Sequence, residues 1–376
     1  MSLNSAISIS QLTTTFEAGL SRITANVNGS LLWFESWDVV LHPVPEAFAS
    51  AFLLPAACHQ AQLIFDQPVS STWLANASRI LALTHQWWNY SNQVPPLKTT
   101  HSEVAPSPIN RTGLYFTGGV DSFYSLLCFN SPIHYLVFVQ GYDVPINDKV
   151  RMAAIEQSLE QITTTLGIKK IVVRTNLRTH PAFRRVSWEQ SHGGALVAIG
   201  YLLSHQLGTM VISSSYPKTV VMPWGTHYEL DPLWSSERLQ FVHFGDDKWR
   251  VDKLAKIADE PLVQQHLRVC WENRSPTGNC SQCEKCIRNM LVLAQQGKLS
   301  AYPVFDQSLP LTKRLDSMLL VNRHLLPAYI NLLRVGLPPD LAWSVKKLVW
   351  RSYLLSWLAS VYRFMRAWLR TIQKIF

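Results

Sequence analysis

The segment Thr117-Gly118-Gly119-Val120-Asp121-Ser122 stands between a short apolar stretch, Gly113 to Phe116, and an apolar-periodic segment, Phe123 to Phe129. This order predicts a strand, a tight glycine turn and a helix, the junction at which doubly wound α/β proteins bind phosphate. Two consecutive glycines let the backbone approach an anion, and the first turn and dipole of the helix favour negative charge. An ordinary turn that happens to use Gly-Gly is the simpler interpretation of six residues taken alone. No Gly-Lys-Ser/Thr follows, which excludes a Walker A loop.

Four cysteines form the second informative feature. Cys270, Cys280, Cys283 and Cys286 lie within one short window, and the last three have C-x2-C-x2-C spacing. Such thiolates can reach one tetrahedral ion at about 2.3 Å from each sulfur, which makes Zn²⁺ the first prediction. An iron–sulfur cluster and disulfides are the alternatives, although a reducing compartment favours metal over disulfides. Because four protein ligands leave no open coordination position, we expect the metal to be structural.

Together the two motifs resemble those of the PP-loop ATP pyrophosphatase superfamily, whose loop is written S-G-G-x-D-S, with Thr117 here in place of the first serine. The pattern C-x9-C-x2-C-x2-C after the loop resembles the zinc motif of the 7-cyano-7-deazaguanine synthase family. The resemblance covers roughly Arg111 to Lys298, and neither the first hundred nor the last seventy residues. Residues around Trp271 and Asp231 resemble a bacterial group of PP-loop proteins without an established reaction.

The resemblance implies an ATP-dependent ligase or amidating enzyme. Such an enzyme would adenylate a carboxylate or amide oxygen of a small molecule, release pyrophosphate, and let ammonia or an amine displace AMP. Asp121 and Ser122 would then be the catalytic residues, with Asp121 orienting the loop or sharing Mg²⁺ with the phosphates. The implied ATP-binding residues are Thr117, Gly118, Gly119, Val120, Asp121, Ser122 and Gln140. A PP-loop sulfur transferase, which would need Cys128 or an iron–sulfur cluster, and a non-catalytic nucleotide-binding protein are the alternatives.

Strands and helices alternate from Gly113 onward, which predicts an α/β fold with a doubly wound parallel sheet of the PP-loop (HUP-like) type. The expected strands are 113–116, 134–140, 170–174, 209–213 and 239–243, and the expected helices are 121–129, 148–166 and 187–205. Ligands bind such sheets beyond the carboxyl ends of the strands. We therefore expect the phosphate loop, Gln140, Arg174 and Ser214 to meet at one edge.

Three domains are expected: an N-terminal α+β domain at 1–100, the PP-loop domain with its zinc site at 111–300, and a helical, basic C-terminal region at 310–376. In the first, Asn28-Gly29 between strands 21–27 and 31–37 is a hairpin signal. A strand at 62–65 and a helix at 72–88 follow. The Pro, Ser and Thr content of 92–110 predicts a linker.

The connection after the fourth parallel strand, Pro223 to Trp234, is the predicted substrate loop. It is long and carries His227 and Asp231, and loops on rigid scaffolds carry function more often than packing. With Ser214 it makes up the candidate substrate site, although its tryptophans could serve only to pack it down. Arg250 could neutralise the leaving pyrophosphate, but its mixed-charge surroundings are also typical of an exposed face.

Basic charge is concentrated at the C-terminus. Residues 311–376 contain eleven Lys/Arg and two Asp, whereas residues 1–310 contain 23 of each sign. A neutral catalytic body argues against a nucleic-acid substrate and leaves a small molecule as the expected partner. The segment Met1 to Leu12 lacks the basic and apolar parts of a signal peptide, so a cytoplasmic protein is expected.

Residues 341–376 predict an amphipathic helix. Trp357, Phe364 and Trp368 share one face, opposite Arg363, Arg366, Arg370 and Lys374. Only eleven residues separate Arg351 from Arg363, whereas a spanning helix needs about 20 apolar residues. We expect either peripheral contact with the inner face of the membrane or docking on protein, where the same stripe would be core.

Overall fold

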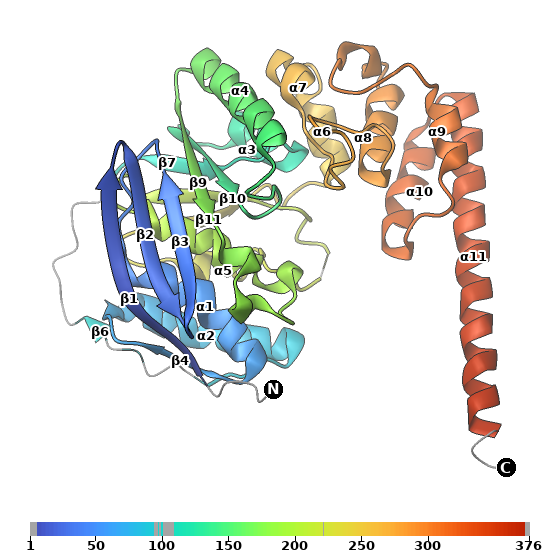
Figure 1. Ribbon diagram of the computed structural model, residues 1–376. Helices are drawn as coiled ribbons and strands as arrows, with labels where there is room; N and C mark the ends of the chain where they lie inside the picture. The colour runs from blue at the N-terminus through green and yellow to red at the C-terminus, as the bar shows by residue number, and fades with distance from the viewer. Residues whose placement is uncertain (1–5, 94–96, 98, 101–108, 221, 373–376) are drawn as a thin grey trace. The chain divides into compact units, whose positions relative to one another are not determined.

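The strands expected after Gly113 form one side of a mixed nine-stranded sheet (Figure 1). The computed structural model describes residues 6–93, 97, 99–100, 109–220 and 222–372. Five neighbouring strands run parallel in this part of the sheet, as the sequence predicts: β11 (Gln240–Phe244), β10 (Thr209–Ser213), β7 (Thr112–Tyr115), β8 (Tyr135–Gln140) and β9 (Lys169–Thr175). The α/β class is confirmed, and the sheet as a whole is mixed because antiparallel strands continue it beyond β9.

Helices cover both faces of the parallel strands. These are α3 (Val120–Cys128), α4 (Lys149–Leu166) and α5 (Trp188–Leu202). Phe241 of β11 packs against Tyr201 of α5, with ring centroids 5.5 Å apart, whereas Phe244 stacks on Tyr124 of α3 at 6.1 Å. Residues three apart in a strand point to opposite faces, so α3 and α5 lie on opposite sides.

The direction in which successive strands are added to the sheet reverses between β7 and β10. Through α3 and α4 the chain moves from β7 to β8 and β9, and through α5 it returns to place β10 on the other side of β7. In open α/β sheets, ligands bind at the carboxyl ends of the strands on either side of such a switch point. The residues that follow β7 and β10 therefore occupy the position at which the fold favours a ligand.

The N-terminal strands belong to the same sheet. β1 (Ala6–Glu17), β2 (Leu20–Val27) and β3 (Ser30–Ser36) form an antiparallel meander, and β4 (Gln62–Phe65) pairs in parallel with β1. The predicted hairpin is confirmed: Asn28 and Gly29 have φ of 49° and 81°, the left-handed conformations of a tight turn. Since β3 pairs with β9, this meander extends the central sheet.

Side chains lengthen the short β3–β9 ladder, which has two paired positions, Phe34 with Thr175 and Glu35 with Arg174. The Asn176 amide accepts from the Trp33 N–H at 2.9 Å and donates to the Leu31 carbonyl at 2.8 Å. At the other end, the Ser36 hydroxyl donates to the Val172 carbonyl at 2.9 Å. Side-chain hydrogen bonds therefore continue the contact between β3 and β9 beyond the two positions paired through the backbone.

Two further helices pack on the face of α5. They are α1 (Pro45–His59) and α2 (Ser71–Trp88), beside a small sheet of β5 (Val69–Ser70) and β6 (Thr99–Thr100). The sequence pattern placed α2 but not α1, because α1 is buried around almost its whole circumference and shows no polar face. The buried Trp73 of α2 donates from Nε1 to the Ser50 hydroxyl of α1 at 3.0 Å.

The chain divides into two compact units, Met1–Arg250 and Val251–Phe376. Boundaries were expected near residues 100 and 310, but strand pairing joins 6–65 to the parallel sheet, and the four cysteines fall in the second unit. The predicted linker at 92–110 lies largely outside the described residues, and Lys374 of the predicted amphipathic helix also lies outside them.

The second unit is helical. Its elements are α6 (Arg250–Ile257), α7 (Pro261–His266), α8 (Glu284–Gln295), α9 (Leu311–Ser317), α10 (Leu326–Val335) and α11 (Pro339–Ile372), with α6 beginning at the last residue of the first unit. The first third of α11 packs against α9 and α10, burying Leu341, Val345 and Leu348. Beyond Ser352 the helix extends away from the other helices of its unit (Figure 1). No helix in the described part of the chain has a stretch long and apolar enough to cross a membrane.

Replacing Asn176 tests whether the N-terminal meander is part of one cooperative sheet. Asn176→Ala removes both bonds to the β3 edge and leaves the groups at Leu31 and Trp33 unpaired, which should lower the free energy of unfolding by about 1–3 kcal/mol. Thermal and urea unfolding measure the change. Asn147→Ala is the matched control, since Asn147 is exposed and has no side-chain hydrogen bond among the described residues. Equal stability of the two variants would contradict this role.

Candidate functional site

The phosphate-loop motif lies between β7 and α3, as the sequence predicts. Gly118 has φ of +73°, a left-handed conformation that glycine adopts without strain. Gly119 is the extended N-cap residue of α3, and no side chain in the described structure caps this helix. The Ser122 hydroxyl donates to the Gly119 carbonyl at 3.0 Å, which holds the turn closed. An uncapped helix start after a glycine turn has the geometry that suits an anion.

Asp121, in the first turn of α3, forms an ion pair with Arg250. Both Nε and Nη2 of Arg250 approach Oδ2 of Asp121, at 2.8 and 2.6 Å. The two side chains are only 16% and 22% exposed, so the pair is partly shielded from water. The mixed charges around Arg250 were also compatible with an exposed face, and the structure instead brings its guanidinium to the loop.

Two other expected site residues shape neighbouring loops with their side chains. Gln140, at the end of β8, donates from Nε2 to the carbonyls of Pro145 and Ile146 at 3.2 and 3.1 Å and accepts from Arg174 Nε at 3.1 Å. Ser214, after β10, is buried and donates to the Tyr216 carbonyl at 2.6 Å. These side chains fix the edge of the sheet.

Asp231 is the centre of the predicted substrate loop and is fully buried at the start of a short 3-10 turn, Asp231–Trp234. Its Oδ1 accepts the N–H of His227 at 3.1 Å, and its Oδ2 lies 2.6 Å from Nδ1 of His243. His227 and Asp231 therefore lie together in the loop. His243 was not among the residues expected at the site, and the available signal was a histidine at the carboxyl end of a predicted strand, the edge where ligands bind.

Aromatic rings and histidines surround this carboxylate. The His227 ring lies 4.8 Å from Trp87 and 4.3 Å from Tyr228, measured between centroids. Nε2 of His192 lies 3.3 Å from the Thr226 hydroxyl. Burial lowers the pKa of both His192 and His227, which favours their neutral forms.

The substrate loop is pressed against α5. A Cβ added to Gly193 of α5 would lie 1.8 Å from the carbonyl oxygen of Gly225 in the loop. The Gly225 N–H donates to the Glu189 carbonyl at 2.8 Å. This contact requires glycine at the helix surface and holds the loop in one position.

The four cysteines converge in the second unit, and their sulfurs all lie within 4.8 Å of one another. Sγ of Cys270 is 4.0 Å from Sγ of Cys283, and Sγ of Cys280 is 3.9 Å from Sγ of Cys286. A tetrahedral ion with 2.3 Å bonds requires sulfurs about 3.8 Å apart, whereas a disulfide requires about 2.05 Å. The group could therefore hold a metal ion such as zinc, and none of the four cysteines forms a disulfide.

One thiol of the group, that of Cys283, has a lowered pKa. A hydrogen bond from the neighbouring Cys286 thiol lowers the pKa of Cys283 to about 6. Since the thiolate is the metal-binding form, this lowered pKa favours the form of Cys283 that could bind a metal at neutral pH.

Two residues that the sequence analysis did not single out hold the cysteine loops. Asn279 accepts the N–H groups of Val269 and Cys270 at 2.8 and 3.1 Å and donates to the Leu267 carbonyl at 2.7 Å. Arg314 is 2% exposed and donates to the Ser281 carbonyl at 2.9 Å. A polar residue next to a metal-binding cysteine is a usable signal for Asn279, but no local pattern links Arg314 to a loop 33 residues away.

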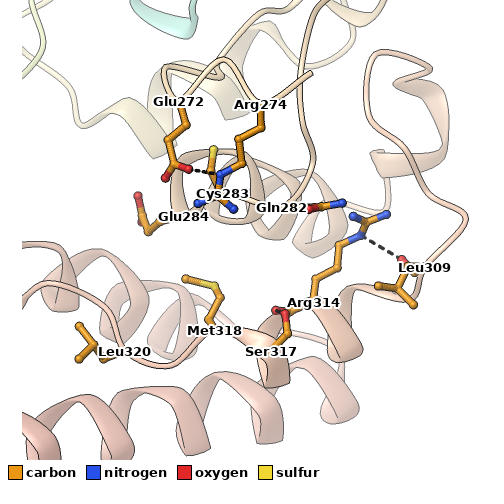
Figure 2. A pocket seen from close by; sticks show the side chains of 10 residues that line it. All are labelled: Glu272, Arg274, Gln282, Cys283, Glu284, Leu309, Arg314, Ser317, Met318 and Leu320. Atoms are coloured by element: carbon orange, nitrogen blue, oxygen red, sulfur yellow. Dashed lines mark hydrogen bonds and ion pairs between the residues drawn. The ribbon is translucent and has the colours of Figure 1, made fainter. Parts of the chain in front are cut away.

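A pocket of about 530 Å³ opens beside Cys283. Figure 2 shows Glu272 and Arg274, joined as an ion pair, beside Cys283, and Arg314 directed towards Leu309. Glu284, which also lines the pocket, pairs with Arg288 at 2.7 Å. Because these charges are paired, the pocket does not offer a ligand one sign of charge.

Comparison with known proteins gives no match, whether against family models, curated proteins or solved structures. The class of the protein therefore rests on its own geometry. It is an α/β protein with a large, mostly parallel sheet, eleven helices among the described residues, and a four-cysteine group that could hold a metal.

Zinc content tests the cysteine group. Purified protein should contain about one zinc per chain, and Cys283→Ser should lower the metal content to near zero and the melting temperature of the second unit with it, because structural metal binding contributes directly to folding. Elemental analysis and calorimetry measure both. Cys128→Ser is the matched control, since Cys128 is a partly buried free cysteine outside the group. Iron with inorganic sulfide, and an absorbance that bleaches on reduction, would identify a cluster instead of zinc.

Proposed function

We propose that this protein is an ATP-dependent enzyme that adenylates a carboxylate or amide oxygen of a small molecule, releases pyrophosphate, and lets ammonia or an amine displace AMP. The observation that carries the proposal is the Gly118-Gly119 turn at the uncapped start of α3, next to the switch point between β7 and β10. Backbone N–H groups at such a helix start are suited to phosphate, and the switch point is where this fold leaves room for a ligand.

In this proposal the phosphates lie against Gly118, Gly119 and Val120, with the hydroxyls of Thr117 and Ser122 beside them. Arg250 brings a positive charge to the same turn through its pair with Asp121. A bound Mg²⁺ would neutralise phosphate charge, and Asp121 is the carboxylate in the loop that could share it, releasing Arg250 to the pyrophosphate. On ATP binding, the pair between Asp121 and Arg250 would then be replaced by a pair of Asp121 with Mg²⁺ and a pair of Arg250 with the pyrophosphate.

The acceptor is proposed to bind beside the substrate loop. His227 and Asp231 are fixed there by hydrogen bonds, and the rings of Trp87 and Tyr228 provide apolar contact area. Ser214 supports this edge through its bond to Tyr216. This mixture of aromatic surface and a few oriented polar groups is typical of small-molecule sites.

The sulfur-transferase alternative places different demands on the chain. Cys128, the cysteine on α3, lies at the opposite end of that helix from the loop, about 12 Å from Val120 at 1.5 Å per residue. A sulfur carrier at that position would be remote from the phosphates. The alternative therefore depends on the four-cysteine group holding an iron–sulfur cluster, which the metal analysis above decides.

ATP binding tests the proposed function directly. Gly119→Val places a branched side chain in the phosphate turn at a position whose extended backbone accepts valine, so the fold should survive. The affinity for MgATP should fall at least tenfold, about 1.4 kcal/mol, as measured by isothermal titration calorimetry. Ser131→Val is the matched control, because Ser131 is exposed and lies after α3. Equal affinity of Gly119→Val and the parent would exclude the loop as the nucleotide site.

We also propose that the outer part of α11 lies on an anionic membrane surface. Trp350, Trp357 and Tyr362 are 62–68% exposed, and Arg366 is also exposed. Exposed aromatics with basic residues on one helix are typical of interfacial anchors. The buried residues of the first third of α11, by contrast, are core.

Liposome binding tests the anchor. Full-length protein should bind phosphatidylserine vesicles and be released by salt, and Arg366→Gln should weaken binding about fivefold, since each basic residue near the surface contributes about 1 kcal/mol. The control is Lys313→Gln, at an exposed position on α9. A chain ending at Ser352 retains the packed part of α11 and should no longer bind. The anchor would be ruled out if the full-length protein did not bind vesicles at low salt. It would also be ruled out if the shortened chain still bound them.

A further inference from the structure

His243 lies at the same sheet edge as the phosphate loop. It pairs with Ile212 of β10, and the register of β10 with β7 places both at the level of Tyr115, two residues before Thr117. One strand, β10, separates β11 from β7, so their axes lie about 10 Å apart, two strand spacings. A small molecule joined to the α-phosphate of a bound nucleotide spans a distance of this order.

Asp231 fixes the orientation and the tautomer of His243. A carboxylate has only acceptors, so the 2.6 Å contact requires the proton on Nδ1, and in the neutral imidazole this leaves Nε2 with its lone pair. The carboxylate is held on its other oxygen by the His227 N–H and is fully buried. In the described part of the chain, the side-chain hydrogen bond of His243 is made by Nδ1, Nε2 has no partner, and the side chain is 5% exposed. This is the arrangement of an oriented base.

We propose that His243 is the general base for the acceptor nucleophile and that Asp231 is its positioning residue. The assignment rests on the proposed adenylating function. As the amine nitrogen attacks the adenylated carbon, the new C–N bond forms, the bond from that carbon to the phosphate oxygen breaks, and AMP leaves with the electron pair. The proton lost by the nitrogen passes to Nε2 of His243, and the resulting imidazolium is stabilised by Asp231.

A purely structural pair would serve only to tie the substrate loop to β11. The neighbouring hydrogen bonds favour a catalytic role, because they already secure this loop without the pair. The N–H groups of Leu230 and Asp231 donate to the His227 carbonyl, and the N–H of Gly225 donates to the Glu189 carbonyl. The titratable groups facing the dyad are His227 from the loop, His192 from α5 and Tyr115 from β7, which all interact electrostatically with Asp231 or His243.

Diethyl pyrocarbonate acylates unprotonated imidazole nitrogens and therefore measures the availability of Nε2 without any acceptor substrate. Full-length protein is treated near neutral pH, and each histidine is followed by mass spectrometry, with exposed His205 as the internal reference. We expect modification of His243, slowed at least fivefold by Mg²⁺ with α,β-methylene-ATP while His205 is unaffected. Asp231→Asn should also slow it at least fivefold, because the wrong tautomer then places the proton on Nε2.

The possible results separate the role of His243 from the proposed function. If His243 is unreactive in the parent protein, or equally reactive in Asp231→Asn, the assignment is overturned. If calorimetry shows nucleotide binding but the nucleotide does not protect His243, the assignment is overturned while the proposed function stands. If no nucleotide binds, the proposed function fails, and this role fails with it. His243→Asn, which keeps a donor towards Asp231, should retain the melting temperature and nucleotide affinity; a loss of stability would support the structural role instead.

Discussion

The parallel pairing of β7 with a neighbour on each side is the constraint on which the rest of the first unit depends. β7 is buried along its length and hydrogen-bonded to β8 and β10, so neither face nor edge is open to water. Gly113 is closely packed, since a Cβ there would lie 2.6 Å from the sulfur of Met210, whose side chain would have to shift. The chain after β7 can leave the sheet only at its carboxyl edge, and there Gly118 and Gly119 turn it into α3. The position of this glycine turn is thus a consequence of how tightly the central strand is enclosed.

Buried polar groups then fix the loops around that edge. Asp231, Gln140 and Ser214 each have hydrogen bonds that tie a loop to a strand or to itself. A buried polar group left unpaired would cost about 1–3 kcal/mol, so these contacts select one arrangement of each loop. The same groups that stabilise the loops also orient His227 and His243, and the site is therefore rigid because its support is buried.

The second unit is held together differently from the first. Its helices are short apart from α8 and α11, and the segment from 267 to 283 has no helix or strand. Asn279 and Arg314 satisfy backbone groups in that segment, and three of the four cysteines lie in it, with Cys286 in the first turn of α8. A metal ion there would join three points of this irregular segment to the start of α8. In the outer part of α11, most of the side chains that the structure describes are exposed.

The sequence by itself determined the local features: the strand–glycine–helix junction at Thr117 to Ser122, the Asn28-Gly29 hairpin, the alternation after Gly113 and the cysteine spacing. Each depends on residues close together in the chain, where periodicity and turn chemistry act directly. Only the tertiary structure decided that β3 pairs with β9, that Arg250 meets Asp121, that His243 meets Asp231, and that Arg314 supports the cysteine loop. These partners are separated by 12 to about 140 residues, and a hydrogen bond or ion pair over such a separation is set by the packing of intervening elements, which leaves no local pattern.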